Sequence, residues 1–343
     1  MRSDAPWGTI RWNVRTSWVP SPALIIVRLD HKIQPFFPSV GQCHPGCLRA
    51  PALLNRTEWC YQSQVTCESH CKGPEKWQEV GSNCGSSNQS PVNIVTKRTL
   101  PDERLAPFRF THYQTNFNGN IKNNGHSVQV NLDHGPLIGN GGLEATYRAV
   151  QFHLHWGADG GPGSEHTVDG ERYPMELHIV HIKEKHGTLE AALQDPTGVA
   201  VLGFFYEESA SSNKKYDPVV NALKNIARAG SSAVVNHISL ASLILPDGNM
   251  TSYYRYKGSL TTPGCAESVV WTVFERAIPL SKAQLGAFSK LNFSDGTAMV
   301  NTFRPVQPLN GRPVYRSGSR ALAAGVALLA ASLSAFVGLS RPN

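Results

Sequence analysis

The chain has 343 residues, of which 41% are hydrophobic, so it can bury the core of one large domain or of two. Its formal net charge is +7, but residues 1–56 carry seven Lys or Arg against two Asp or Glu, and residues 316–343 carry three Arg and no acid. The middle is close to neutral and has no basic patch interleaved with aromatic residues, which excludes a nucleic-acid-binding surface.

Residues 1–30 lack a proper secretory signal peptide, because the longest apolar run near there, residues 23–27, is too short. Two explanations for residues 1–56 stay open: a wrongly assigned first exon in place of the true signal peptide, or a genuine, disordered basic extension. Seven cysteines in the chain nevertheless indicate an oxidising compartment. N-glycosylation sequons at Asn55, Asn249 and Asn292 agree with export, whereas the one at Asn88 runs into Pro91 and is expected to stay unmodified.

Alternation of apolar and polar residues with period two dominates the middle of the chain and predicts strands. Helix signals are few: they cover residues 218–229, and residues 281–291 with Ser281 as the N-cap. We therefore predict a mainly β, single-domain fold with short peripheral helices. The expected strands span residues 127–132, 151–157, 175–182, 199–206 and 268–274.

Two histidines two residues apart, His153 and His155, give the strongest functional signal. On a strand, side chains at i and i+2 share a face, so both imidazoles can reach one point. A second alternating strand adds His178 with Glu176 two residues before it, and Gln151 holds the matching place beside His153. Three neutral imidazoles with one open position are typical of a catalytic zinc site, and the carboxylate and the amide can fix the ring tautomers.

Simpler interpretations compete with a metal site. An isolated His-x-His pair is weak evidence for a metal, and the third histidine with its carboxylate is what favours one. His181 and His186 are interpreted as ordinary core or surface histidines. The cluster contains no cysteine, which argues against a zinc finger, and the chain has no His-Glu-x-x-His motif of another kind of zinc hydrolase.

Seven motifs, in order along residues 59–316, resemble the α-class carbonic anhydrases. Single motifs are moderately specific, but seven in order are very specific. The resemblance implies one large, twisted, mostly antiparallel central sheet with a zinc ion at the bottom of a cone. The motifs are QSPVNI (residues 89–94), NNGHSVQV (123–130), QFHLHWG (151–157), SEHTVDG (164–170), MELHIVHI (175–182), GSLTTPG (258–264) and FRPVQPLNGR (303–312).

The resemblance implies that Zn²⁺ is bound by His153, His155 and His178. It gives Gln151 and Glu176 the role of outer acceptors that hold the ligand rings, and the carbonyl of Thr302 the same role for His155. It implies that Thr261 accepts a hydrogen bond from zinc-bound hydroxide and that Glu165 receives the proton of Thr261. His126 matches the proton shuttle. Tyr61, Asn124 and Thr262 match groups that order the water chain, and Thr262, Val180, Val201, Leu260, Val269 and Trp271 match the substrate pocket.

The activity implied is reversible hydration of carbon dioxide to bicarbonate and a proton, by attack of zinc-bound hydroxide. Sulfonamides and anions are the expected inhibitors, and bicarbonate transporters are candidate partners. Some members of the family have lost zinc ligands and serve as interaction domains, so a catalytically weak binding module is the alternative. Intact ligands decide between the two, and here all three histidines, Glu165 and Thr261 are present.

The resemblance is closest to the membrane-anchored, disulfide-bearing branch of the family. It implies the disulfides Cys84–Cys265 and Cys60–Cys71, with Cys60–Cys67 still open and Cys43 and Cys47 unassigned. Residues 57–316 are then the enzyme domain.

Residues 317–343 form a hydrophobic tail. Residues 321–339 carry no charge and follow three small residues, which is typical of a glycosylphosphatidylinositol signal with attachment at Ser317 or Gly318. The expected location is the extracellular face of the plasma membrane. Because about 20 apolar residues suffice to span a bilayer, a retained transmembrane helix is the alternative.

Overall fold

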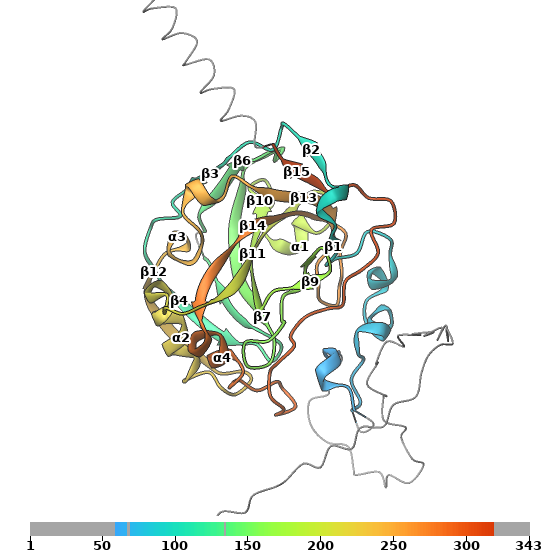
Figure 1. The fold of residues 1–343 in the computed structure, drawn as a ribbon. Helices are drawn as coiled ribbons and strands as arrows, with labels where there is room; N and C mark the ends of the chain where they lie inside the picture. The colour runs from blue at the N-terminus through green and yellow to red at the C-terminus, as the bar shows by residue number, and fades with distance from the viewer. Residues whose placement is uncertain (1–58, 67–68, 134, 319–343) are drawn as a thin grey trace, which may run out of the picture. The chain divides into compact units, whose positions relative to one another are not determined.

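The computed structural model describes residues 59–66, 69–133 and 135–318 (Figure 1). The basic extension, the apolar tail, the sequon at Asn55 and three of the cysteines lie outside the described residues. Those cysteines are Cys43, Cys47 and Cys67. No helix among the described residues is both long and apolar enough to cross a bilayer.

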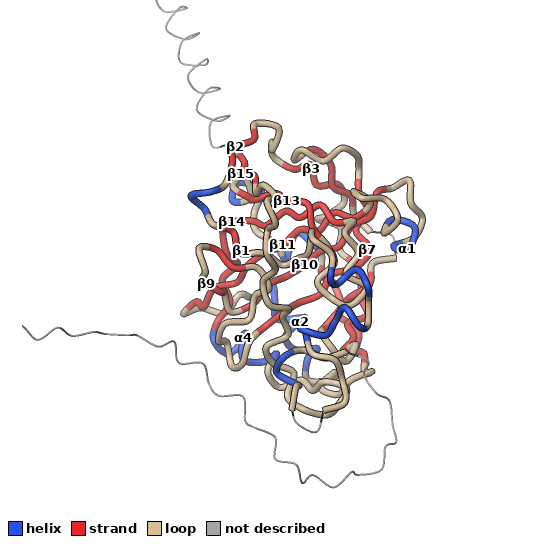
Figure 2. Tube along the Cα trace, turned by 90° about the vertical axis from the view of Figure 1, so that its right-hand side faces the viewer, coloured by secondary structure: helices blue, strands red, loops and turns tan. Residues whose placement is uncertain are grey.

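The described chain is mainly β, as predicted, with a few short helices (Figure 2). The strands are β1 (Asn93–Ile94), β2 (Leu100–Asp102), β3 (Phe108–Thr111), β4 (Phe117–Asn123), β5 (Val128–Asn131), β6 (Leu137–Asn140), β7 (Tyr147–Trp156), β8 (Thr167–Val168), β9 (Glu171–Arg172), β10 (Met175–Lys183), β11 (Val199–Ser209), β12 (Ser232–Ile238), β13 (Tyr253–Gly258), β14 (Val269–Ser281) and β15 (Tyr315–Ser317). The α-helices are α1 (Leu189–Ala192), α2 (Asp217–Leu223), α3 (Leu240–Leu243) and α4 (Lys282–Phe288). The 3₁₀ helices are η1 (Gln62–Gln64), η2 (Pro74–Glu79), η3 (Ser82–Gly85), η4 (Thr96–Arg98), η5 (Lys214–Tyr216) and η6 (Asp247–Asn249).

One 12-stranded sheet organises the fold, in the order β12-β4-β5-β7-β10-β11-β14-β13-β15-β2, with β6 paired to β7 and β3 to β6. The β11–β14 and β15–β2 pairs are parallel and the other pairs of this sheet are antiparallel. The sheet is therefore mostly antiparallel, and Figure 1 shows its strands twisting across the molecule. A small second sheet joins β1, β8 and β9.

Strand alternation divides the core into two clusters, one on each face of the central sheet. Phe152 and Leu154 of β7 pack into the larger cluster, with Leu177 and Ile179 of β10. His153, His155 and His178 alternate with these apolar residues along β7 and β10 and therefore face the other way. The second cluster on that face is built from Val180, Val201, Val269, Trp271 and their neighbours.

The two predicted helices exist but are shorter than expected. Helix α4 begins after Ser281, whose side chain accepts a hydrogen bond from the Gln284 N–H, so the predicted N-cap is confirmed. Helix α2 ends at Leu223, six residues before the predicted end at residue 229. The side-chain amide of Asn123 donates to the carbonyls of Ile226 and Ala227, so those carbonyls are bonded outside a helix.

Candidate metal centre

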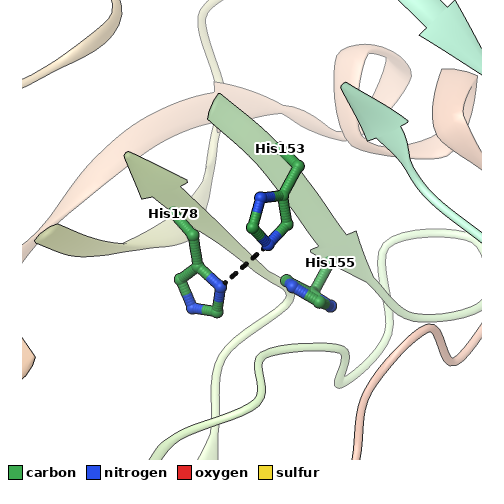
Figure 3. A group of neighbouring side chains, drawn as sticks. All are labelled: His153, His155 and His178. Carbon is green, nitrogen blue, oxygen red and sulfur yellow. Dashed lines mark hydrogen bonds between the residues drawn. The ribbon is translucent and has the colours of Figure 1, made fainter. Parts of the chain in front are cut away.

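Three histidine side chains meet on the two central strands β7 and β10 (Figure 3). The antiparallel register sets His178 opposite His153, and Glu176 opposite His155. Their ring centroids are 4.7 to 5.2 Å apart, and one nitrogen of each ring lies within 4.8 Å of the others. His155 and His178 are buried and His153 is half-buried, so His153 is the ligand that solvent reaches most easily.

Each ring has its second nitrogen bonded to an acceptor, which fixes its tautomer. His153 donates from Nδ1 to Gln151 Oε1 at 2.8 Å, and His155 donates from Nδ1 to the carbonyl of Thr302 at 2.6 Å. His178 donates from Nε2 to Glu176 Oε1 at 2.7 Å. The three remaining nitrogens therefore carry lone pairs, and all three point to one place.

This arrangement suits a divalent cation. His153 Nε2 and His178 Nδ1 are 3.3 Å apart, so two lone pairs face each other (Figure 3), and His155 Nε2 is buried without a hydrogen-bond partner. Burial and the neighbouring rings lower the pKa of His153 well below its usual value, and burial lowers the pKa of His155. Both rings are therefore neutral at pH 7, as metal ligation requires.

A second layer of contacts fixes Glu176. Its Oε2 accepts the backbone N–H groups of Glu165 and His166 at 2.8 and 2.9 Å, and its Oε1 also accepts from His166 Nδ1 at 2.7 Å. Burial opposes ionisation of Glu176, but His166 and His178 hold the pKa of its carboxyl well below the usual range. His166 in turn accepts from Tyr256 OH at 2.6 Å. His166 and Tyr256 were not predicted as site residues, although His166 lies inside the SEHTVDG motif.

The carboxylate of Glu165 is fully buried beside the metal ligands. Its Oε1 accepts the backbone N–H of Arg304 at 2.9 Å, and its Oε2 lies 3.4 Å from His155 Nε2 without a hydrogen-bond partner. Thr261 is buried in the loop that follows β13, and the structure does not join its hydroxyl to Glu165 by a hydrogen bond. Oε2 of Glu165 therefore remains an available acceptor.

The apolar side chains of the predicted substrate pocket gather in one cluster on the histidine face. Val180, Val201, Val269 and Trp271 are buried there and Leu260 packs against them. The indole of Trp271 donates to the carbonyl of Ser259 at 3.0 Å, which holds the loop carrying Leu260, Thr261 and half-buried Thr262. These residues form a dry wall beside the imidazoles.

The predicted shuttle, His126, lies stacked on Trp59, with ring centroids 3.8 Å apart and planes inclined by 12°. Its backbone N–H donates to Asn124 Oδ1, so Asn124 shapes the turn that carries His126. Burial lowers the pKa of His126 to about 4, and its Nδ1 has no hydrogen-bond partner. Tyr61 contacts the same Trp59 edge-on, at 5.3 Å. Trp59 was not singled out from the sequence.

The phenol of Tyr61 is buried and its OH has no hydrogen-bond partner. Burial and the nearby carboxylate of Glu165 raise its pKa well above the usual value, so the phenol keeps its proton at any physiological pH.

Two disulfides close the described domain: Cys60–Cys71, and Cys84–Cys265 across a separation of 181 residues. Both are the pairings that the resemblance implies. The bond between Cys84 and Cys265 ties η3 to the loop that carries Thr261, because Cys265 N–H also donates to the carbonyl of Thr262.

Comparison with known proteins agrees with this geometry. The family model described as eukaryotic-type carbonic anhydrase matches residues 72–318, which is most of the chain. The chain belongs to this family. As a member, it is a carbonic anhydrase enzyme, and its three clustered histidines are positioned to bind a metal ion.

Named relatives support the same conclusion. The chain is 42% identical to carbonic anhydrase 4 of Oryctolagus cuniculus over 276 residues, which is 79% of this carbonic anhydrase and 88% of the relative. Identity is 38% over 265 residues with carbonic anhydrase 4 of Rattus norvegicus, covering 76% and 85%. It is 35% over 294 residues with carbonic anhydrase 15 of Mus musculus, covering 82% and 90%.

Proposed function

We propose that this enzyme hydrates carbon dioxide reversibly to bicarbonate and a proton, using Zn²⁺ held by His153, His155 and His178. The observation that carries the proposal is the convergence of three imidazole lone pairs whose other ring nitrogens are all engaged. A bound Zn²⁺ supplies a nucleophile at neutral pH by lowering the pKa of water to about 7, as is already known for carbonic anhydrases.

Gln151, Glu176 and the Thr302 carbonyl keep the three ligand rings in position and in the correct tautomer. Glu165 Oε2 is a free acceptor, and in the proposed mechanism it accepts a hydrogen bond from the Thr261 hydroxyl. The oxygen of Thr261 can then only accept, which orients the attacking group. The same pair favours inhibitors that carry a proton, such as sulfonamides.

Carbon dioxide is small and apolar, so an apolar pocket suits it better than charged binding groups do. The wall of Val180, Val201, Leu260, Val269 and Trp271 provides that pocket beside the imidazoles, and the proposal adds Thr262 from the same loop as Leu260. Apolar contacts there exclude water from the place where the new bond forms.

We assign proton export to His126, with Tyr61, Asn124 and Thr262 ordering the water chain that leads to it. A shuttle works best when its pKa is near the operating pH. In the stacked position the pKa of His126 is about 4, so the ring carries little proton at pH 7. The shuttle role therefore requires the imidazole to leave Trp59 and become hydrated.

We place the enzyme at the extracellular face of the plasma membrane, held by a lipid anchor at Ser317 or Gly318, with a single transmembrane helix as the alternative. The two disulfides and the uncharged residues 321–339 support this location. The enzyme domain is residues 57–316, residues 317–343 are the anchor signal, and residues 1–56 stay unassigned. Bicarbonate transporters are the partners that the reaction suggests, and Asn249 and Asn292 are the candidate glycosylation sites.

The test is the metal content and the hydration rate of His155→Ala. His155 is the only one of the three ligands whose free nitrogen is buried and unpartnered among the described residues, so its loss removes a fully buried ligand. We expect zinc affinity to fall by about 100-fold or more and sulfonamide-sensitive hydration to disappear. His186→Ala is the matched control, because His186 contacts Asp195 at the surface. Full zinc content and full hydration in His155→Ala contradict the assignment.

A further inference from the structure

A buried arginine lies on the face of the sheet opposite the histidines. Arg255 of β13 is set between Thr272 of β14 and Tyr315 of β15. Its neighbours in sequence, Tyr254 and Tyr256, belong to the cluster on the histidine face. Because side chains alternate along a strand, Arg255 points away from the metal centre.

The guanidinium of Arg255 is only partly hydrogen-bonded, and its carbon lies 5.8 Å from the ring centroids of Phe108 and Tyr253. Nε and Nη2 donate to Thr272 Oγ1 at 3.1 and 3.0 Å, and Nη2 also donates to the carbonyl of Gly141 at 2.8 Å. Nη1, with two N–H groups, forms no hydrogen bond, and no carboxylate of the described chain forms an ion pair with Arg255. The residue is 7% exposed, and burial lowers its pKa. Asp102, the carboxylate that interacts with Arg255 through space, is already paired with Arg104, so a bound anion would stabilise the buried cation further.

The free end of Arg255 faces a cavity. The cavity has a volume of about 430 Å³ and lies between β2, β13, β15 and the turn at Gly142. A Cβ placed on Gly142 would lie 3.4 Å from Arg255 Nη1, so the glycine leaves that side of the nitrogen open. Lys257 follows two residues after Arg255 on the same strand, lines the same cavity and is exposed.

The acids that line the cavity are already neutralised. Asp102 is held by the guanidinium of Arg104, with contacts at 2.9 and 2.8 Å. Glu144 is paired with Lys183. Arg255 and Lys257 therefore leave a surplus of two positive charges at this cavity. Both carboxylates that line it are paired with cations, so neither strongly repels an incoming anion.

We propose that this cavity is a second anion site, in which Arg255 Nη1 and Lys257 bind the oxygens of a phosphate group. Two positive charges suit a phosphate better than a monovalent anion. The phosphate can belong to a lipid headgroup or to a free ion. A headgroup is within reach, because Tyr315 lines the cavity and lies two residues before Ser317, a proposed site of lipid attachment.

The experiment is a calorimetric titration of inorganic phosphate into the purified protein saturated with a sulfonamide, which keeps phosphate from the metal centre. We expect saturable binding with Kd in about the millimolar range. Lys257→Gln should weaken it by about threefold or more, because one cation at the cavity is lost while every buried contact of Arg255 stays. Arg255→Lys should abolish binding. Lys224→Gln, which removes an exposed lysine after α2, is the matched control and should leave Kd unchanged.

Sedimentation of phosphatidylcholine vesicles, with and without phosphatidic acid, distinguishes a lipid headgroup from a free phosphate ion as the ligand of this cavity. Binding that needs phosphatidic acid and falls in Lys257→Gln, but not in Lys224→Gln, assigns the site to a lipid headgroup. Phosphate binding without vesicle binding assigns it to a free ion. The proposal is overturned if neither phosphate nor vesicles bind saturably, or if all variants bind equally. Zinc content and hydration rate should be unchanged in every variant, so the result is independent of the metal centre.

Discussion

Trp59 shows how a single residue sets the properties of another. Its indole covers His126, and burial lowers the pKa of that imidazole to about 4. We expect Trp59→Ala to expose the ring and raise its pKa toward about 6.5, because hydration favours the charged form. A titration of the His126 ring signals by NMR measures this shift. Trp59→Phe, which keeps an aromatic cover, should shift the pKa less. A pKa that stays near 4 in Trp59→Ala would mean that another group buries His126.

The same variant should also change catalysis if His126 exports the proton. A ring that titrates near pH 7 passes protons better, so hydration in weak buffer should become faster in Trp59→Ala. In a His126→Ala background the substitution at Trp59 should then have no effect on the rate. An equal effect in both backgrounds would show that Trp59 acts on catalysis by another route.

At the residue scale, the sequence predicts those contacts that depend on the spacing of residues along one strand. His153 and His155 share a face because they are two apart on a strand, and Glu176 reaches His178 for the same reason. The contacts of Trp59 with His126, and of Arg304 with Glu165, join residues far apart in sequence. Local sequence patterns contain no information about such distant pairs, so these contacts became known only from the structure.

At the scale of elements, the Cys84–Cys265 disulfide joins η3 to the loop that carries Thr261, and it closes a loop across 181 residues. In the chain-entropy model its removal costs about 5 kcal/mol of unfolding free energy, against about 3 kcal/mol for Cys60–Cys71, which spans 11 residues. We expect the double variant Cys84→Ser/Cys265→Ser to be the less stable in urea and to hydrate carbon dioxide more slowly. Cys60→Ser/Cys71→Ser is its control, and equal losses of stability would contradict the loop-length argument.

Element types were predictable from the sequence, and element ends were not. Alternation at residues 151–157 and 175–182 predicts β7 and β10, whose bounds differ by a few residues. The early end of α2 could not be predicted. The carbonyls of Ile226 and Ala227, which follow the helix, accept hydrogen bonds from Asn123, about 100 residues away. The order of strands in the sheet also depends on such distant pairing and was not predicted, because the family resemblance implied only one large, mostly antiparallel sheet.

At the scale of the whole molecule, histidines buried in the neutral state link the stability of the fold to pH. His181 is buried, in contact with Tyr113 OH at 2.6 Å, and burial lowers its pKa to about 4. Between pH 6.5 and pH 4, His181 binds a proton in the unfolded chain, where the pKa of histidine is near 6.5, but stays neutral in the folded chain. The free energy of unfolding therefore falls as pH falls through this window, by about 3 kcal/mol for His181.

The substitution His181→Gln keeps a hydrogen-bonding side chain for Tyr113 and removes the titration. We expect it to reduce the loss of unfolding free energy between pH 7 and pH 4 by about 3 kcal/mol, measured by urea unfolding of both proteins at each pH. Comparing the two proteins cancels the shared contribution of the metal ligands, because both keep His153, His155 and His178. The same loss in both would mean that the pKa of His181 is about the same in the folded and unfolded chains, so that this residue does not contribute to the pH dependence.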